Sequence, residues 1–237
     1  MNGEILKSAS VQSNEVSEKD IKLINQYTMK ELKAEDVFTF KLAMCDNQVD
    51  RDFEQFTDNA LTGLAKLFKG KTVISDHYRK SENQCARIYN TEVAEDGTVK
   101  RLVAYCYTLN NEKNKDFISD VEAGIKKEVS VGCSVAKAIC SICGTDNALS
   151  YCSHYPGREY AKENGKEKCV FKLDGAKDAY EVSFVAVPAQ KEAGVIKAYG
   201  EKPCTELPKE NKSIESDVGL TIKLMDAFNF IENEKRN

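Results

Sequence analysis

Three cysteines and one histidine lie close together in the stretch "CSICGTDNALSYCSH", with the spacing Cys140-x2-Cys143-x8-Cys152-x-His154. Three thiolates and one imidazole form a complete tetrahedral ligand set for zinc, which leaves no open position for water and makes such a site structural. The surrounding segment, about residues 139–169, has too few apolar side chains to fold around a core of its own. The pattern therefore predicts a zinc-knuckle insertion inside a larger domain.

Other interpretations of the cysteines stay open at this stage. Cys133 or Cys169 can replace one of the four ligands, and the cluster can also be a set of ordinary cysteines in a loop. The chain has nine cysteines, and in a reducing compartment clustered cysteines indicate metal binding or catalysis before disulfides.

Charge and hydropathy limit the partners that we expect. The chain of 237 residues carries 34 Lys and Arg against 38 Asp and Glu, a net charge of -4, so no overall basic field attracts nucleic acid or a membrane. The N-terminus lacks the apolar run of a signal peptide, and no stretch approaches the ~18 apolar residues of a membrane span. We expect a soluble, cytosolic protein without a nucleic-acid partner.

Apolar periodicity predicts an α+β fold on a mostly antiparallel sheet or barrel with flanking helices. One helix is capped by Thr57 or Asp58 and ends at Gly70, and Asp96-Gly97 marks a hairpin turn. A second pair of strands is expected around Asp174-Gly175. The expected strands are 37–44, 71–77, 87–93, 100–109, 128–139, 168–173 and 179–187, and a second helix lies in 114–127.

The domain organisation follows from shifts in composition. Residues 1–27 are polar and are expected to form a flexible leader, and 28–198 form the main domain, which contains the insertion. Residues 199–215 are rich in proline and charge, as is typical of a linker. Residues 216–237 carry an apolar stripe at helical spacing, and this amphipathic helix must bury the stripe on its own domain or on a partner.

Histidine chemistry has few options, because the chain contains only His77 and His154. If His154 binds metal, His77 alone remains as a base that could activate a serine. The tripeptide EVS occurs in two expected strands; strand alternation puts Ser130 on the less apolar face of the first, and Glu181 begins the second. A surface histidine and a strand serine that bonds locally are the plainer interpretations.

The order of these motifs resembles the prohead proteases of tailed bacteriophages. These capsid-maturation serine proteases have a fold similar to herpesvirus assemblin. The resemblance spans about residues 37–195 and rests on "DRDFEQFTDNALTGLAKLFKGKTVISDH", "RIYNTEV", "GIKKEVSVGC" and "AYEVSFVAVPAQKEAGV". It implies that His77, Ser130 and Glu181 are the catalytic residues. The chain departs from the family pattern at Gly132-Cys133, where Gly-Phe is common, and in having the zinc insertion.

The resemblance also implies a function and a location. We expect a serine endopeptidase that cleaves scaffold and major capsid protein inside assembling proheads, in the cytoplasm of the bacterial host. A homo-oligomer is one option for its assembly. Two alternatives remain: a catalytically inactive structural or scaffolding protein of the same fold, and a thiol enzyme that uses Cys133 or Cys85. The thiol enzyme requires a lowered cysteine pKa.

Overall fold

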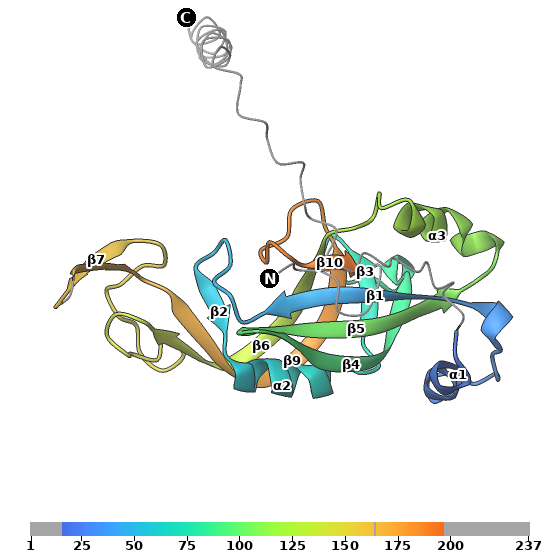
Figure 1. Ribbon diagram of the computed structural model, residues 1–237, viewed down its shortest axis with the longest axis horizontal. Coiled ribbons are helices and arrows are strands. Elements are labelled where there is room, and N and C mark those ends of the chain that lie inside the picture. The colour runs from blue at the N-terminus through green and yellow to red at the C-terminus, as the bar shows by residue number, and fades with distance from the viewer. Residues whose placement is uncertain (1–15, 164, 197–237) are drawn as a thin grey trace, which may run out of the picture. The chain divides into compact units, whose positions relative to one another are not determined.

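The computed structural model describes residues 16–163 and 165–196, which form a strand-rich open sheet with a few short helices (Figure 1). The predicted α+β class is confirmed. Residues 1–15, the expected linker 199–215 and the expected helix 216–237 lie outside the described residues. None of the helices within the described ranges has the length and hydrophobicity that crossing a lipid bilayer requires.

The elements of the described chain follow the order expected from the sequence, with several additions. The helices are α1 (Glu18–Ile24), α2 (Asp58–Leu67) and α3 (Lys115–Glu122), and short 3-10 turns occur at Ala34–Asp36, Ser81–Asn83 and Glu112–Asn114. The strands are β1 (Val37–Asp46), β2 (Glu54–Phe56), β3 (Thr72–Ser75), β4 (Ala86–Asp96), β5 (Val99–Leu109), β6 (Val129–Cys140), β7 (Glu159–Lys162), β8 (Gly165–Lys168), β9 (Phe171–Phe184) and β10 (Gly194–Ile196).

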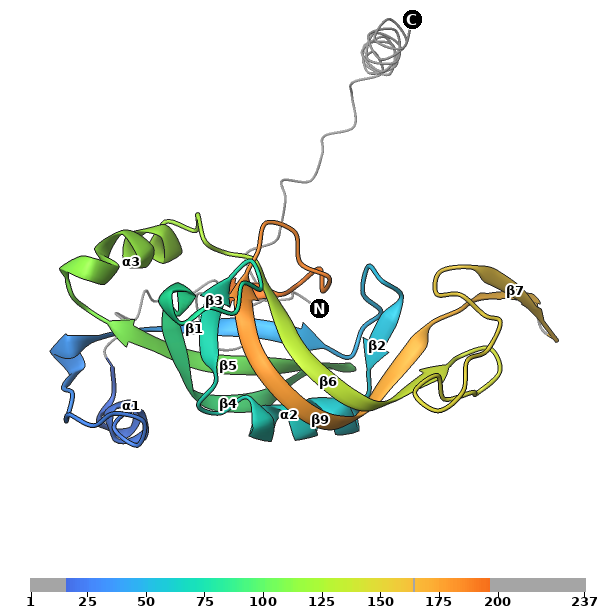
Figure 2. The same ribbon diagram turned by 180° about the vertical axis from the view of Figure 1, so that it is seen from behind.

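The main sheet has eight strands in the order β10-β1-β5-β4-β3-β9-β2, with β6 on the other edge of β9 (Figure 2). The pairs that β9 forms with β2 and β3 are parallel, and the other pairs of this sheet are antiparallel. An isolated bridge between Glu128 and Gly194 brings the β6 and β10 ends of the sheet into contact. Strand β9 is therefore the element around which β2, β3 and β6 are organised.

Helix α2 shows how the local sequence sets an element. Thr57 is the N-cap, and its hydroxyl accepts a hydrogen bond from the Ala60 amide. This bond satisfies one of the free amide donors of the first turn. Leu61 and Leu64 are fully buried on the face that packs against β9. Gly70 follows with φ +79°, a conformation that glycine adopts without steric cost. The predicted cap and apolar face of this helix are confirmed, and the helix ends at Leu67, three residues before the predicted Gly70.

The prediction of two strands around Asp174-Gly175 is wrong, because β9 runs without a break through both residues. Gly175 has φ +70°, the conformation that makes Asp-Gly a turn signal, but here it lies opposite Ala136 in the ladder. The register to β6 shifts nearby, between Ser134 and Val135. Such irregularities bend a strand without ending it.

Asp174 ties this bend to the start of α2. Its Oδ1 accepts hydrogen bonds from the Thr57 hydroxyl at 2.6 Å and from the Asn59 amide at 3.0 Å. These two bonds lower the pKa of Asp174 below its ordinary value of 3.8, and the bond from Thr57 has the larger effect.

An Asp174→Asn variant tests this contact through its pH dependence. A lowered folded-state pKa contributes stability that is present above the ordinary value and is lost as the pH falls through the lowered pKa. We expect the wild type to be the more stable protein at neutral pH, and the gap in melting temperature to close between about pH 5 and about pH 2. Melting curves across this range measure the gap, and a gap independent of pH would contradict the role of the Asp174 charge.

Helix α1 corrects the expected leader. The Ser17 hydroxyl and the Asp20 carboxylate form a reciprocal capping box, which fixes the start of the helix. Ile24 is fully buried in a cluster with Tyr89 and Tyr107 of the sheet. Residues 16–27 therefore belong to the folded domain. Their composition is polar, which favoured a flexible leader, but Ile24 within them is a core residue.

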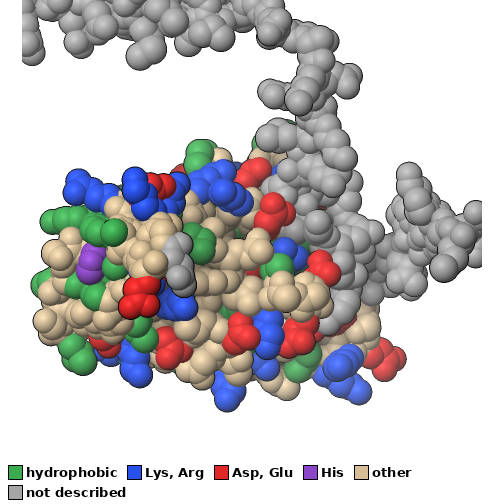
Figure 3. Space-filling model, turned by 60° about the vertical axis from the view of Figure 1, so that its left-hand side comes forward, with side chains coloured by type: hydrophobic (Ala, Val, Ile, Leu, Met, Phe, Trp, Pro, Cys, Tyr) green, Lys and Arg blue, Asp and Glu red, His purple; other side chains and the backbone are tan. Residues whose placement is uncertain are grey.

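The chain leaves the main sheet after Cys140 and returns to it at Phe171, close to the expected bounds of the insertion. The excursion contains the small β7-β8 hairpin and lies at one end of the β6-β9 ribbon (Figures 1 and 2). Lys and Arg side chains are interspersed with Asp and Glu side chains on the face of the molecule in Figure 3.

Candidate active site and metal centre

His77 is placed by a left-handed turn at the end of β3. Asp76 and His77 have φ values of +53° and +52°, which non-glycine residues adopt at a cost of roughly 1–2 kcal/mol each. Two hydrogen bonds hold the turn: the Asp76 amide donates to the Phe184 carbonyl at 2.9 Å, and the His77 amide donates to the Ser183 hydroxyl at 2.7 Å. The turn brings the imidazole back to β9.

The imidazole contacts Glu181 across 104 positions of sequence. His77 Nδ1 lies 2.9 Å from Glu181 Oε1. The Glu181 side chain is only 2% exposed, whereas that of His77 is 41% exposed. A buried carboxylate requires a charged or hydrogen-bonding partner, and His77 is the partner at hydrogen-bond distance. The family resemblance implied this partnership, and the structure brings the two residues together.

Gly132 makes the room that Glu181 occupies. It lies directly opposite Glu181 in the β6-β9 ladder, and a Cβ at this position would stand 2.1 Å from Glu181 Oε1. Any larger residue would displace the carboxylate. The sequence marked Gly132 only as part of the Gly132-Cys133 pair, because a cross-strand contact can be recognised only when the register is known.

Two further residues support the pair, and the sequence analysis missed their roles. Ser183 is fully buried and accepts the His77 amide, so it fixes the backbone of the histidine. Arg79 Nη2 lies 3.7 Å from Glu181 Oε1, and its guanidinium stacks over the Tyr180 ring at 4.6 Å. The polar sequence of this loop, "SDHYRK", does not indicate which of its charges faces Glu181.

Ser130 lies on the strand beside the pair. It is directly opposite Ser183 in the β6-β9 ladder, and Glu181 lies two ladder positions away on the same face. Opposed residues in an antiparallel pair stand about 4.5–5.5 Å apart and share one face. Among the hydrogen bonds of the described residues none joins Ser130 to His77. The structure thus places all three predicted residues in one region, with only His77 and Glu181 in direct contact.

The cysteines of this region do not have the properties of nucleophiles. Burial raises the pKa of Cys85 to about 11, and burial together with the charges of Glu181 and Glu54 raises the pKa of Cys133 to about 11. Thiols with such values stay protonated at neutral pH, whereas the thiolate is the reactive form. The thiol-enzyme alternative requires a cysteine with a lowered pKa, and neither Cys85 nor Cys133 has one.

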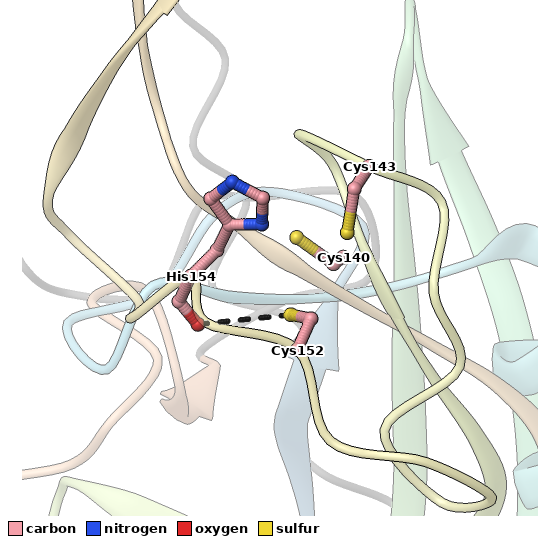
Figure 4. Close-up of side chains that lie close together, drawn as sticks. All are labelled: Cys140, Cys143, Cys152 and His154. Carbon is pink, nitrogen blue, oxygen red and sulfur yellow. Dashed lines mark hydrogen bonds between the residues drawn. The ribbon is translucent and has the colours of Figure 1, made fainter.

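The predicted metal ligands gather in the insertion. One ligand atom from each of Cys140, Cys143, Cys152 and His154 lies within 4.8 Å of every other. Figure 4 shows the three sulfurs and one ring nitrogen of the histidine turned toward a common centre. Tetrahedral zinc with bonds of about 2.3 Å draws sulfur ligands to about 3.8 Å apart, so a small contraction suffices. This cluster can hold a metal ion.

The chemistry of the donors fits a metal. Hydrogen bonds with the side chain and backbone of Thr145 lower the pKa of Cys143 to about 6, and the backbone of His154 lowers the pKa of Cys152. Burial raises the pKa of Cys140, and the nearby cysteines 152 and 143 raise the pKa of His154. The buried Nδ1 of His154 has no hydrogen-bond partner within the described residues. A metal ion that coordinates the imidazole would account for a nitrogen without a hydrogen bond.

The packing of the insertion also fits a metal. Leu149, Tyr151 and Tyr155 are exposed, so they form no core. Cys169 is buried 3.7 Å from the Cys140 sulfur, but burial and this contact raise its pKa to about 12 and it is not one of the four gathered ligands. The earlier alternative in which Cys169 replaces a ligand is thus less well supported than the predicted set.

Comparison of the chain with protein-family models, with curated proteins and with solved structures found no match in any of the three.

Proposed function

We propose that this protein is a serine endopeptidase in which Ser130, His77 and Glu181 form the catalytic triad. The observation that carries the proposal is the 2.9 Å contact between His77 Nδ1 and the buried Glu181 carboxylate, next to a serine on the neighbouring strand. A buried acid that orients a histidine is the arrangement that general-base activation of a serine requires.

Each residue has one role in the proposed mechanism. Glu181 accepts the Nδ1 proton of His77 in a hydrogen bond, so the lone pair of Nε2 is free to act as the base. Nε2 takes the Ser130 hydroxyl proton while Oγ attacks the scissile carbonyl, and it then protonates the leaving amine. Water repeats the sequence on the acyl-enzyme and releases the acid. In the absence of substrate such hydrogen bonds are often long, so a Ser130-His77 bond is expected to form on substrate binding.

The resemblance to phage prohead proteases supplies the substrate class in this proposal. The substrates are scaffold and major capsid protein, and cleavage takes place within the assembling prohead in the bacterial host. The assemblin-like arrangement belongs to the same proposal. The contact between the β6 and β10 ends of the sheet at Glu128 and Gly194 supports it, since closing these ends is what a barrel requires.

We also infer that the metal of the insertion is zinc. Three thiolates and one imidazole are the ligand types that zinc prefers in closed structural sites. Its part is to hold the insertion together, and no catalytic step depends on it.

Processing assays with a matched control test the proposal. The full-length protein is co-expressed with its candidate capsid and scaffold substrates, and the wild type is compared with Ser130→Ala and with Ser134→Ala on the same strand. A phosphonate probe for activated serines, located by mass spectrometry, provides a readout that needs no substrate.

We expect the wild type and Ser134→Ala to process the substrates and to carry the label on Ser130. Unchanged processing by Ser130→Ala would show that the nucleophile is wrongly assigned. A wild type that neither processes nor takes the label would favour the alternative of an inactive structural protein of the same fold.

A further inference from the structure

A cavity of about 290 Å³ opens beside Ser130 and is distinct from the contact between His77 and Glu181. Asp50, Asp52 and Glu54 form one wall, and Ala189 and Gln190 form a second wall. The two walls are tied together by Arg51, whose amide donates to the Ala189 carbonyl and whose guanidinium donates to the Pro188 carbonyl at 2.7 Å. The floor is apolar and includes Met44, Phe56, Val131 and Leu173.

The first wall is acidic, and Arg51 beside it directs its guanidinium to the Pro188 carbonyl and not to a carboxylate of the wall. Asp50, Asp52 and Glu54 all line the cavity. No Lys or Arg among the described residues forms an ion pair with any of the three. Asp50 has a structural role, because its Oδ1 accepts the amides of Asp52 and Glu54. Glu54 shares the inward face of β2 with the buried Phe56, so this carboxylate faces the cavity side.

The second wall provides a free hydrogen-bond donor. Gln190 lines the cavity and is only 7% exposed. Its Nε2 is buried and has no hydrogen-bond partner within the described residues. An unpaired buried amide costs about 1–3 kcal/mol, and a ligand carbonyl in the cavity would remove that cost.

The arrangement fits a cationic side chain better than a metal ion. In the described part of the chain, the only group of His, Cys, Asp and Glu ligand atoms that converges closely enough for a metal is the cluster of the insertion. The three carboxylates of the cavity therefore do not converge on one point as ligands of a calcium ion do. A spread acidic wall over an apolar floor suits the aliphatic stem and charged head of lysine or arginine.

We propose that this cavity binds a lysine or arginine side chain of the substrate next to the scissile bond. Glu54 and Asp52 accept the charged head, the floor covers the stem, and Gln190 donates to a substrate carbonyl. This inference rests on the proposed function, since Ser130, the proposed nucleophile, is one of the residues that line the cavity. It names the substrates as peptides with a basic residue near the cleavage point.

A peptide library tests the inference on the purified full-length protein. Equimolar peptides that vary one position at a time are digested, and cleavage sites are read by mass spectrometry. Glu54→Gln and Asp52→Asn remove one charge each with little change in shape, and Glu122→Gln, on α3 away from the cavity, is the control.

We expect the wild type and the control to prefer Lys or Arg beside the scissile bond. Glu54→Gln should lower kcat/KM for those peptides by about 10- to 100-fold, the effect of losing one charge-assisted hydrogen bond. Its cleavage of neutral peptides should change less than about twofold. A preference for acidic or apolar residues, or a basic preference that persists in the Glu54→Gln Asp52→Asn double variant, would overturn the inference while leaving the peptidase intact.

Binding separates this inference from the proposed function. N-acetyl-arginine amide and N-acetyl-glutamine amide are titrated into Ser130→Ala, with NMR shifts as the readout. If no peptide is cleaved, the proposed function fails, but selective arginine binding that disappears with Glu54→Gln still supports a cation-binding cavity. Equal shifts with both ligands, or none with either, would overturn the cavity assignment whatever the cleavage assay shows.

Discussion

A Gly132→Ala variant is expected to lose about 10⁴-fold in peptidase kcat while keeping its fold, the loss seen when the acid of a triad no longer orients its histidine. The new methyl group would stand 2.1 Å from Glu181 Oε1 and 2.9 Å from its Cδ. These atoms belong to the end of a flexible side chain, so the carboxylate moves away and the strands remain paired. His77 then loses the partner that holds its tautomer.

Glu181→Gln provides the complementary variant, because it keeps the shape of the side chain and removes its charge. Both variants should fall to a similar residual activity, and combining them should cost little more, since the two changes disable one contact. Ser134→Ala on the same strand is the control for the strand itself. Melting curves show whether the fold survives. A Gly132→Ala protein with normal kcat and an intact fold would mean that Glu181 does not act through His77.

The parts of the fold that could be predicted from the sequence are those that short-range patterns determine. The Thr57 cap and the apolar face of α2 are spaced by helical geometry, and the Asp96-Gly97 turn sets the β4-β5 hairpin. The parallel pairs of β9 with β2 and β3 have no such local signature. Gly175 gave a misleading signal, because a positive φ serves a bend inside β9 as well as it serves a turn.

The two candidate sites differ in the same way. The metal cluster depends on spacing within one short segment, and the four ligands that the spacing indicated do converge. The partnership of His77 with Glu181 depends on β3 lying parallel to β9, and the sequence pointed to it only through the resemblance. The acidic cavity was not predicted, since β2 was not recognised as a strand and its Glu54 had no assigned face.

Removing the metal should have the second large effect, and we expect it to unfold the insertion. The purified full-length protein should contain about one zinc per chain, and Cys143→Ser should lower zinc affinity by more than about 100-fold. Zinc contributes roughly 10–16 kcal/mol to the folding of small zinc modules, and the insertion has no apolar core to replace it. Residues 141–170 should then become susceptible to proteolysis and lose protection from hydrogen exchange.

The consequences of metal loss should extend to β2, because the insertion packs against Phe53, the residue that precedes β2. The Phe171 amide donates to the Phe53 carbonyl at 3.0 Å, and Gly157 lies against the Phe53 ring with no room for a Cβ. Loosening the insertion should therefore raise hydrogen exchange in β2, the wall that carries Glu54, while β1, β4 and β5 stay protected.

A Cys85→Ala variant, which removes a thiol outside the cluster, is the control and should keep its zinc. A Cys143→Ser protein with full zinc content and a protected insertion would contradict the metal assignment, and normal protection of β2 after zinc loss would show that the insertion does not support the cavity wall.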